Sequence, residues 1–296
     1  MNGAQSLLKA LIDAANPREF KRRIKMLKIR SISLLLTLTL ALVLAITGAA
    51  FAEDTEEELA KKLSNPVASL ISVPLQYNYD KNIGPNDDGS KSVLNIQPVW
   101  PFSLNADWNL ITRTIIPLVD QHDIPVKGEH DSGLGDILQS FFFSPKEPVG
   151  GWILGAGPVL LYPSATDSLL GGEKWGAGPT VVALQQIHGW TYGILANHVE
   201  SFAGKDDRAY ISSTFLQPFL TYTTKTKTTF GLNTESTYDW HNSAWSVPVN
   251  FTVAQLFKIG NLPLQLGAGV RYWAESPENG PEGFGARLVL TFLFPK

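Results

Sequence analysis

The last ten residues of the chain, 287–296 (RLVLTFLFPK), alternate in polarity, and what covers their apolar face decides the fold. Successive side chains of an extended strand lie on opposite faces. One face collects the large apolar side chains, namely Leu288, Leu290, Phe292 and Phe294. The other face carries a charge at Arg287 and a hydroxyl at Thr291. The apolar face must therefore be covered either by a protein core or by lipid.

The same two-residue period runs through most of the chain from about residue 67 onward. Its clearest examples are AWSVPVNFTVAQLF (residues 244–257) and NLPLQLGAGVRYW (residues 261–273). About twelve such segments are found, near residues 68–80, 91–101, 106–118, 134–144, 151–162, 175–187, 189–201, 209–223, 227–240, 244–257, 262–274 and 285–295. Alternation repeated this often predicts an all-β protein.

The connections between these segments are alternately long and short. DKNIGPNDDGSK (residues 80–91) and VDQHDIPVKGEHDSG (residues 119–133) are long, whereas PFSLN (residues 101–105) and IHG (residues 187–189) are short. Outer-membrane barrels have short periplasmic turns, longer external loops and an even number of strands. The pattern predicts an antiparallel up-and-down transmembrane β-barrel of about 12 strands over residues 67–296, located in the cell outer membrane.

Aromatic residues near the strand ends favour the same interpretation. One group lies near the short turns: Trp100, Trp108, Trp152, Trp190, Phe257 and Phe294. A second group lies near the long loops: Tyr79, Tyr162, Trp175, Tyr210, Trp240, Trp245, Tyr272 and Trp273. Two such girdles are typical of the two membrane interfaces. We therefore expect the face with Phe292 and Phe294 to lie against lipid.

Proline is the main argument against a barrel, because each proline removes a hydrogen bond from the sheet. Most of the prolines fall near a proposed strand end, but Pro74 lies in the middle of the first strand. It predicts a bulge or an irregular first strand. A secreted two-sheet sandwich, whose edges tolerate proline, remains the alternative fold.

The N-terminal residues have the pattern of an export signal. A basic run precedes the apolar stretch 32–50, and Ala50, Phe51 and Ala52 form a small-x-small cleavage site. We expect residues 1–52 to be a signal peptide; because Met26 is a conventional start, residues 1–25 are either a gene-start extension or a long amino-terminal region. A retained membrane anchor is the alternative, since the apolar stretch is long enough to span.

The next segment, residues 53–66 (EDTEEELAKKLSNP), predicts a short polar helix in the periplasm that Pro66 ends and that is not buried. Export implies transit through the export and barrel-assembly machinery, with outer-membrane lipid as the final partner.

Composition excludes several classes of protein. The absence of cysteine removes disulfides and thiolate chemistry, and a net charge of −3 gives no basic surface for nucleic acid. A mean hydropathy of +0.00 is too polar for a membrane protein with several helical spans. We expect no nucleic-acid partner and no cofactor.

Four blocks of sequence resemble a known family. They are ELAKKLSNPVASLISVPLQYNYD (residues 58–80), SGLGDILQSFFFSPK (132–146), GWILGAGPVLLYPSATD (151–167) and VLTFLFPK (289–296). The chain is similar over nearly its whole mature length to the bacterial outer-membrane proteins of the MetA-pathway of phenol degradation, which are often labelled transporters. The resemblance implies an outer-membrane barrel with a transport role and carries no catalytic residue or substrate. Outer-membrane proteins generally end on an aromatic residue, whereas Pro295 and Lys296 follow Phe294 here.

Catalytic and metal-binding patterns are weak. In GEHDSGLGD (residues 128–136), His130 precedes Ser132 by two positions, an arrangement that a hydrolase can use when base and nucleophile touch. The run lies at a glycine-rich junction of loop and strand, so we interpret both as solvated loop residues. The other histidines are scattered and predict no metal site.

Polar side chains on the face opposite lipid are the candidates for the lumen. They are Asn95, Gln97, Arg113, Asn233, Glu235, Asn250, Gln265, Arg271 and Arg287. A charge facing lipid at mid-membrane costs a few kcal/mol, so inward placement is favoured. Opposed arginine and glutamate form either a salt-bridged plug or a charged constriction, and the sequence leaves both open.

The leading hypothesis is a passive outer-membrane channel or transporter for small-molecule solutes, in part apolar, and not an enzyme. One alternative is a closed barrel that serves structure or surface binding through acidic loops with Asp87, Asp88, Asp206 and Asp207. The other is a membrane-embedded hydrolase that uses His130 and Ser132.

Overall fold

The computed structural model describes residues 56–294. All of them belong to the second of two compact units, Phe51–Lys296. The predicted signal peptide and the final two residues, Pro295 and Lys296, lie outside the described range. No helix among the described residues is long and apolar enough to cross a membrane.

One helix and fifteen strand segments make up the described chain. Their bounds are α3 Glu56–Leu63, β1 Ile71–Ile83, β2 Gly89–Ile96, β3 Val99–Ser103, β4 Trp108–His122, β5 His130–Leu134, β6 Ile137–Pro145, β7 Ile153–Tyr162, β8 Lys174–Ile187, β9 Trp190–Gly204, β10 Ser212–Thr223, β11 Thr228–Thr234, β12 Ser236–Asp239, β13 Ala244–Ile259, β14 Leu262–Glu275 and β15 Gly283–Phe294. Three pairs, β2 with β3, β5 with β6, and β11 with β12, are halves of one interrupted strand, because both halves pair with the same neighbour. Twelve strands result, as the alternation predicts.

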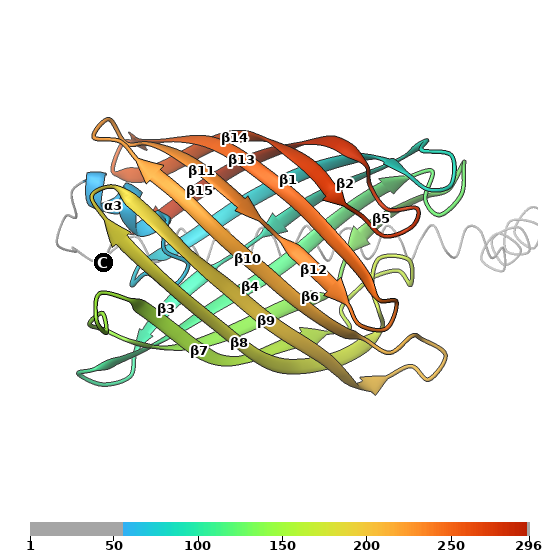
Figure 1. Ribbon diagram of the computed structural model, residues 1–296, viewed down its shortest axis with the longest axis horizontal. Coiled ribbons are helices and arrows are strands. Elements are labelled where there is room, and N and C mark those ends of the chain that lie inside the picture. Colours follow the sequence, from blue (N-terminus) through green and yellow to red (C-terminus); the bar gives the residue numbers. More distant parts are fainter. Residues whose placement is uncertain (1–55, 295–296) are drawn as a thin grey trace, which may run out of the picture. The chain divides into compact units, whose positions relative to one another are not determined.

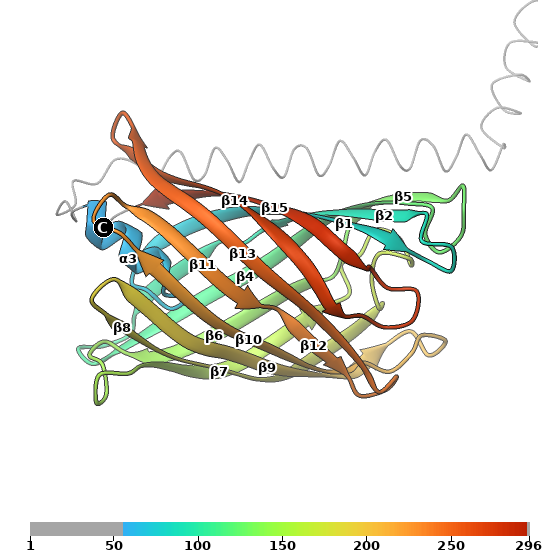
Figure 2. The ribbon, with the colours of Figure 1, turned by 45° about the horizontal axis from the view of Figure 1, so that its top comes forward.

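The sheet closes on itself. Consecutive strands pair antiparallel, and β1 pairs with β15 from Ile71 opposite Phe294 to Tyr79 opposite Ala286. Figures 1 and 2 show the resulting barrel of tilted strands. A closed barrel has no edge strand, so the prediction of a transmembrane barrel is confirmed and the two-sheet sandwich is excluded.

The long loops gather at one end of the barrel and the short turns at the other (Figure 1). The short-turn end also holds α3 and the end of β15. One predicted loop is wrong: β4 runs to His122 and β5 begins at His130, so only residues 123–129 connect them. The hairpin extends because residues 118–122 and 130–134 pair across the whole stretch.

The irregularity expected at Pro74 lies in the neighbouring strand instead. The ladder between β1 and β15 continues through Pro74, which is in register with Thr291. Across the other side, Gln97 N–H donates to Pro74 O over 2.8 Å, and Pro98, which has no N–H, separates β2 from β3. The two prolines therefore interrupt β2 and β3 rather than the first strand.

The exposure of the side chains on β15 shows which face of the last strand points out of the barrel. Leu288 is 52% exposed, whereas Arg287 is 3% and Leu293 is 0% exposed. The apolar face with Leu288 points away from the barrel interior, where lipid covers it, and the face with Arg287 points inward.

One face of helix α3 is buried, contrary to the sequence-based expectation of a helix that is not buried. Leu59 and Ala60 pack with Leu70, Leu256 and Leu293 in one apolar cluster on the inner wall. Polar residues dominate the segment, but its few apolar side chains lie on one side and hold the helix inside the short-turn end. The Gln186 side chain fixes it further, since its Nε2 donates to the Lys61 carbonyl over 2.8 Å.

Candidate functional site: the barrel lumen

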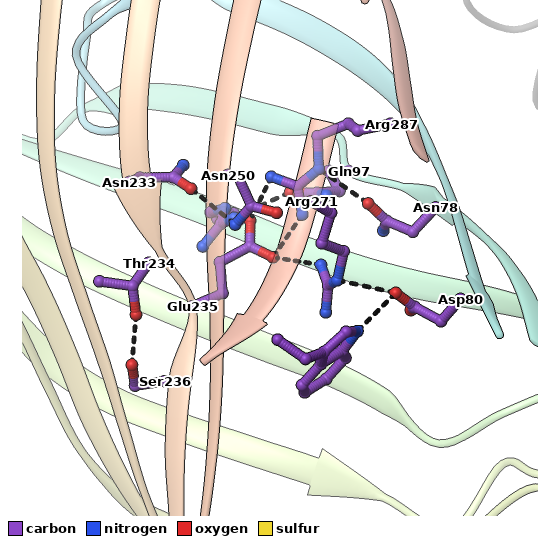
Figure 3. A network of polar contacts seen from close by, with 12 residues as sticks. Asn78, Asp80, Gln97, Asn233, Thr234, Glu235, Ser236, Asn250, Arg271 and Arg287 are labelled. Carbon is purple, nitrogen blue, oxygen red and sulfur yellow. Dashed lines mark hydrogen bonds and ion pairs between the residues drawn. The ribbon is translucent and has the colours of Figure 1, made fainter. Parts of the chain in front are cut away.

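Glu235 stands at the centre of the interior polar groups, in the gap between β11 and β12. Its N–H donates to Pro248 O over 3.3 Å, opposite a position on β13 where proline offers no N–H in return. The flanking hydroxyls of Thr234 and Ser236 hydrogen-bond to each other (Figure 3). The interrupted ladder thus presents the Glu235 carboxylate inward, where 18% of the side chain remains exposed.

Arg287 on β15 holds that carboxylate with two hydrogen bonds. Its Nη1 donates to Glu235 Oε1 over 2.9 Å and its Nη2 to Oε2 over 2.6 Å. Its Nε donates to Asn78 Oδ1 on β1 over 2.7 Å. A bidentate, charge-assisted pair of this kind fixes both side chains in one orientation.

Arg271 on β14 joins the same carboxylate from another side (Figure 3). Its Nη1 donates to Glu235 Oε2 over 3.3 Å, and its Nε lies 3.1 Å from Asp80 Oδ1. Trp273 Nε1 also donates to Asp80 over 2.7 Å, and the Arg271 guanidinium lies 4.7 Å from the Trp273 ring centre. Trp273 is therefore a lumen residue, and its assignment to the outer girdle was wrong: it shares the face of Arg271 two positions earlier, while Tyr272 points outward.

Strand register puts seven of the nine candidate positions on the inner face, and the other two, Gln97 and Glu235, lie in strand interruptions with side chains bonded to inward arginines. Only some of the nine touch one another. Arg113 Nη2 donates to Gln97 Oε1 over 2.8 Å, and Asn250 Nδ2 donates to Asn233 Oδ1 over 2.9 Å. Gln265 is in register with Thr291 and Leu256, nearer the helix. Asn95 is in register with Gln76 and Pro117.

The lumen network, defined as Asp80, Arg113, Glu235, Arg271 and Arg287, carries more positive than negative charge. Three guanidinium groups face two carboxylates, and Lys91, directly opposite Asp80 in the sheet, adds a fourth cation. Sequence reasoning missed Asp80 and Lys91, although the two-residue alternation of their strands places both side chains on the inner face. Charges in a partly dehydrated interior interact more strongly than they would in bulk water.

Three cavities lie along the interior. The first, about 270 Å³, lies beside the segment after α3 and is lined by residues including Asn65, Arg113, Phe219, Gln265 and Arg287. The second, about 990 Å³, opens among the long loops and is lined by residues including Arg208, Tyr210, Ser213, Thr237 and Glu278. The third, about 230 Å³, is mainly apolar and is lined by residues including Arg113, Ile115, Leu138, Leu161, Ser213, Phe215 and Thr237. Ser213 and Thr237 line both the second and the third cavity, and Arg113 lines both the third and the first.

The histidine–serine motif lies on the opposite face of the wall. His130 and Ser132 belong to β5, not to a loop, and His130 Nε2 lies 3.0 Å from Asp120 Oδ1 on β4. No hydrogen bond joins His130 to Ser132 in the described part of the chain, so the contact that activates a nucleophile is not made. Sequence reasoning missed that His122 lies next to His130, because the two are eight residues apart in the chain and meet only when β4 pairs with β5.

The fold resembles solved outer-membrane barrels. An outer membrane channel from Pseudomonas putida F1 superposes with a TM-score of 0.61 and 16% identity, over 76% of this chain and 96% of that chain. The NanC porin gives a TM-score of 0.47 and 10% identity over 76% and 100%. Outer membrane phospholipase A from Escherichia coli gives 0.45 and 10% over 82% and 99%. No family model and no curated protein sequence matches the chain. The chain has the fold of an outer-membrane β-barrel, and its apolar outer face fits that membrane.

Proposed function

We propose that the protein is a passive outer-membrane channel for small molecules that carry an apolar portion. The observation that supports this best is the succession of three cavities, each of which shares lining residues with the next. In this proposal they are successive parts of one route from the long loops towards the short-turn end. A barrel with a purely structural role has no need of such a route.

The third cavity gives the proposal its solute class. Its walls are formed by Ile115, Leu138, Leu161 and Phe215, which come from four different strands and point to the inside of the barrel. Apolar side chains facing a water-filled lumen are unfavourable unless something apolar covers them. A solute with an apolar portion gains contact there, while Arg113 at the border offers a partner for an anionic group.

The charge of the lumen network supports a preference for anions over cations. Its guanidinium groups outnumber its carboxylates, and a ring of positive side chains favours anions in a pore. Neutral apolar solutes experience no such bias. We therefore assign the channel to apolar anions and neutral apolar molecules rather than to cations.

In this proposal, α3 and the segment that follows it close the short-turn end of the channel. The segment from α3 to Leu70 packs against Leu256 and Leu293 on the inner wall. Passage through the first cavity then requires this segment to move, which makes it the gate of the proposed channel. The resemblance to the MetA-pathway family, which implies a transport role, also supports a channel.

A second candidate function is a permanently closed structural barrel. The bidentate contact of Arg287 with Glu235 favours it, because this ion pair lies across the lumen and holds β15 to the β11–β12 strand. In this case the three cavities are packing defects, and no continuous path connects the two ends of the barrel.

Conductance and solute flux distinguish the two functions. Purified protein is inserted into planar bilayers for conductance and into liposomes for uptake of benzoate and gluconate, an apolar and a polar monoanion. A channel of the proposed kind gives single-channel currents with anion selectivity and faster uptake of benzoate than of gluconate. Absence of both current and uptake, from protein that shows the heat-modifiable gel migration of a folded barrel, establishes the closed barrel instead.

A further inference from the structure

A cluster of two imidazoles and one carboxylate lies on the outside of the wall at the long-loop end. Asp120 and His122 are on β4, and His130 is on β5, which Figure 2 shows near that end. His122 is directly opposite His130 in the ladder, and Asp120 is opposite Ser132. All three side chains of the cluster are about half exposed.

The donor atoms of this outer cluster converge on one another. Asp120 Oδ1 lies 3.1 Å from His122 Nε2 and 3.0 Å from His130 Nε2. The two imidazole rings stack with their centres 4.0 Å apart and 15° between their planes. One donor atom from each residue falls within a set whose members all lie within 4.8 Å of one another.

This spacing suits a small transition-metal ion. Two donors bound tetrahedrally to zinc at about 2.0 Å each lie about 3.3 Å apart, close to the separations of Asp120 Oδ1 from the imidazole nitrogens. The two imidazole nitrogens need only modest rotation of exposed side chains to complete the set. Two imidazoles and a carboxylate are ligands that zinc and its neighbours in the transition series prefer, whereas calcium and magnesium prefer oxygen alone.

We propose that Asp120, His122 and His130 bind a divalent transition-metal ion, with Zn²⁺ as the probe that tests it, on the outer wall of the barrel above the lipid. Three protein ligands leave the fourth tetrahedral position open to water or to a ligand from outside the cell.

The backbone that carries the ligands is fixed before any ion arrives. Five consecutive residue pairs join β4 to β5, from Leu118 opposite Leu134 to His122 opposite His130. The connecting residues are tied back as well, since Asp123 N–H donates to the Glu129 carbonyl over 2.7 Å. Ligands on paired strands lose little freedom on binding, which favours affinity.

The arrangement fits a metal better than it fits a hydrolase. Both imidazoles direct a nitrogen at the same carboxylate oxygen, so neither is held between an acid and Ser132. In a hydrolase, one aspartate orients one histidine. Such a site would not require the second, stacked imidazole.

Calorimetric titration of Zn²⁺ into the untagged full chain in detergent tests the proposal. One Zn²⁺ ion should bind per chain. His122→Ala and His130→Ala should each weaken Zn²⁺ binding about tenfold or more, and the double variant should abolish Zn²⁺ binding. Protons compete for imidazole, so affinity should also fall in acid.

His241→Ala is the matched control, because His241 is exposed beside Asp239 but belongs to no group of three metal-ligating side chains among residues 56–294. It should bind Zn²⁺ as the unchanged chain does. Equal affinity in the double variant and in the control, or no binding by the unchanged chain, would overturn the proposal. Heat-modifiable gel migration verifies that each variant is folded.

Discussion

The lumen network and the outer cluster are built in the same way and have opposite surroundings. Both bring ionisable side chains together from different strands, which are not all adjacent in the lumen network but are the paired strands β4 and β5 in the outer cluster. Arg287 in the lumen is 3% exposed and binds Glu235 with both of its Nη atoms, whereas the side chain of Asp120 on the outer wall is 51% exposed. The difference teaches that burial, not the number of contacts, decides how much stability is lost when one partner of an ionic cluster is removed, because solvent compensates a charge left on the surface and not one left in the interior.

Removing the central carboxylate of the lumen network should have the largest effect. Glu235→Ala leaves Arg271 and Arg287 buried without their shared partner, so the free energy of unfolding should fall by about 3–5 kcal/mol. Urea unfolding of the protein in detergent or lipid vesicles measures it. Glu147→Ala, an exposed carboxylate on a short turn, is the control and should stay within about 0.5 kcal/mol. Equal losses in the two variants would remove the distinction between buried and exposed charges.

Locking α3 to the wall tests whether the closed end is a gate. The chain has no cysteine, so Leu59→Cys with Leu256→Cys introduces the only thiols, within the apolar cluster that seats the helix. Oxidation should lower single-channel conductance strongly, and a reductant should restore it. The two single-cysteine chains are controls and should not respond to oxidant. Full conductance of the oxidised double variant would show that solutes pass without movement of the helix.

Changing one charge at the border of the apolar cavity should alter selectivity with little loss of stability. Arg113 hydrogen-bonds to Gln97 but forms no direct ion pair with Glu235 at contact distance. Its replacement should therefore reduce stability less than replacement of Arg271 or Arg287. Arg113→Gln should shift the anion-to-cation permeability ratio several-fold towards cations. Reversal potentials in a salt gradient measure the ratio.

Lys225→Gln is the control for selectivity, since it removes the same charge from an exposed short turn. It should leave the ratio nearly unchanged. If Arg113→Gln does the same while conductance persists, Arg113 lies off the pathway.

The smallest effect is expected on the outer wall. Without added metal, Asp120→Asn should change the free energy of unfolding by no more than about 0.5 kcal/mol, because exposed ionic contacts contribute little. The same urea unfolding provides the comparison with Glu235→Ala. A loss as large as that of the lumen variant would mean that the outer cluster is a structural part of the hairpin.

Much of the architecture follows from the two-residue period and the connection lengths. Segments such as 244–257 read as strands because apolar and polar residues alternate without interruption, and β13, Ala244–Ile259, covers that range. The local sequence pattern gives the wrong end of a strand where pairing with another strand extends it. Residues 119–122 are polar enough to be interpreted as loop, yet they remain in β4 because β5 pairs with them.

Burial of the helix was also beyond the local pattern. The segment around Leu59 is rich in charges, and its few apolar side chains find partners only on the inner wall. The wall exists as a concave surface only after the strands close, so no property of residues 53–66 alone identifies it.

By itself the sequence determines the strand segments and the side of the wall on which each side chain lies, because the alternation of a strand is a local property. The tertiary structure alone decides which inward residues meet. Arg287 binds Asn78, 209 residues away, and Trp273 binds Asp80, 193 residues away, because β15 closes against β1. The partners of the lumen charges, and therefore whether they neutralise one another or face a solute, are set by that closure.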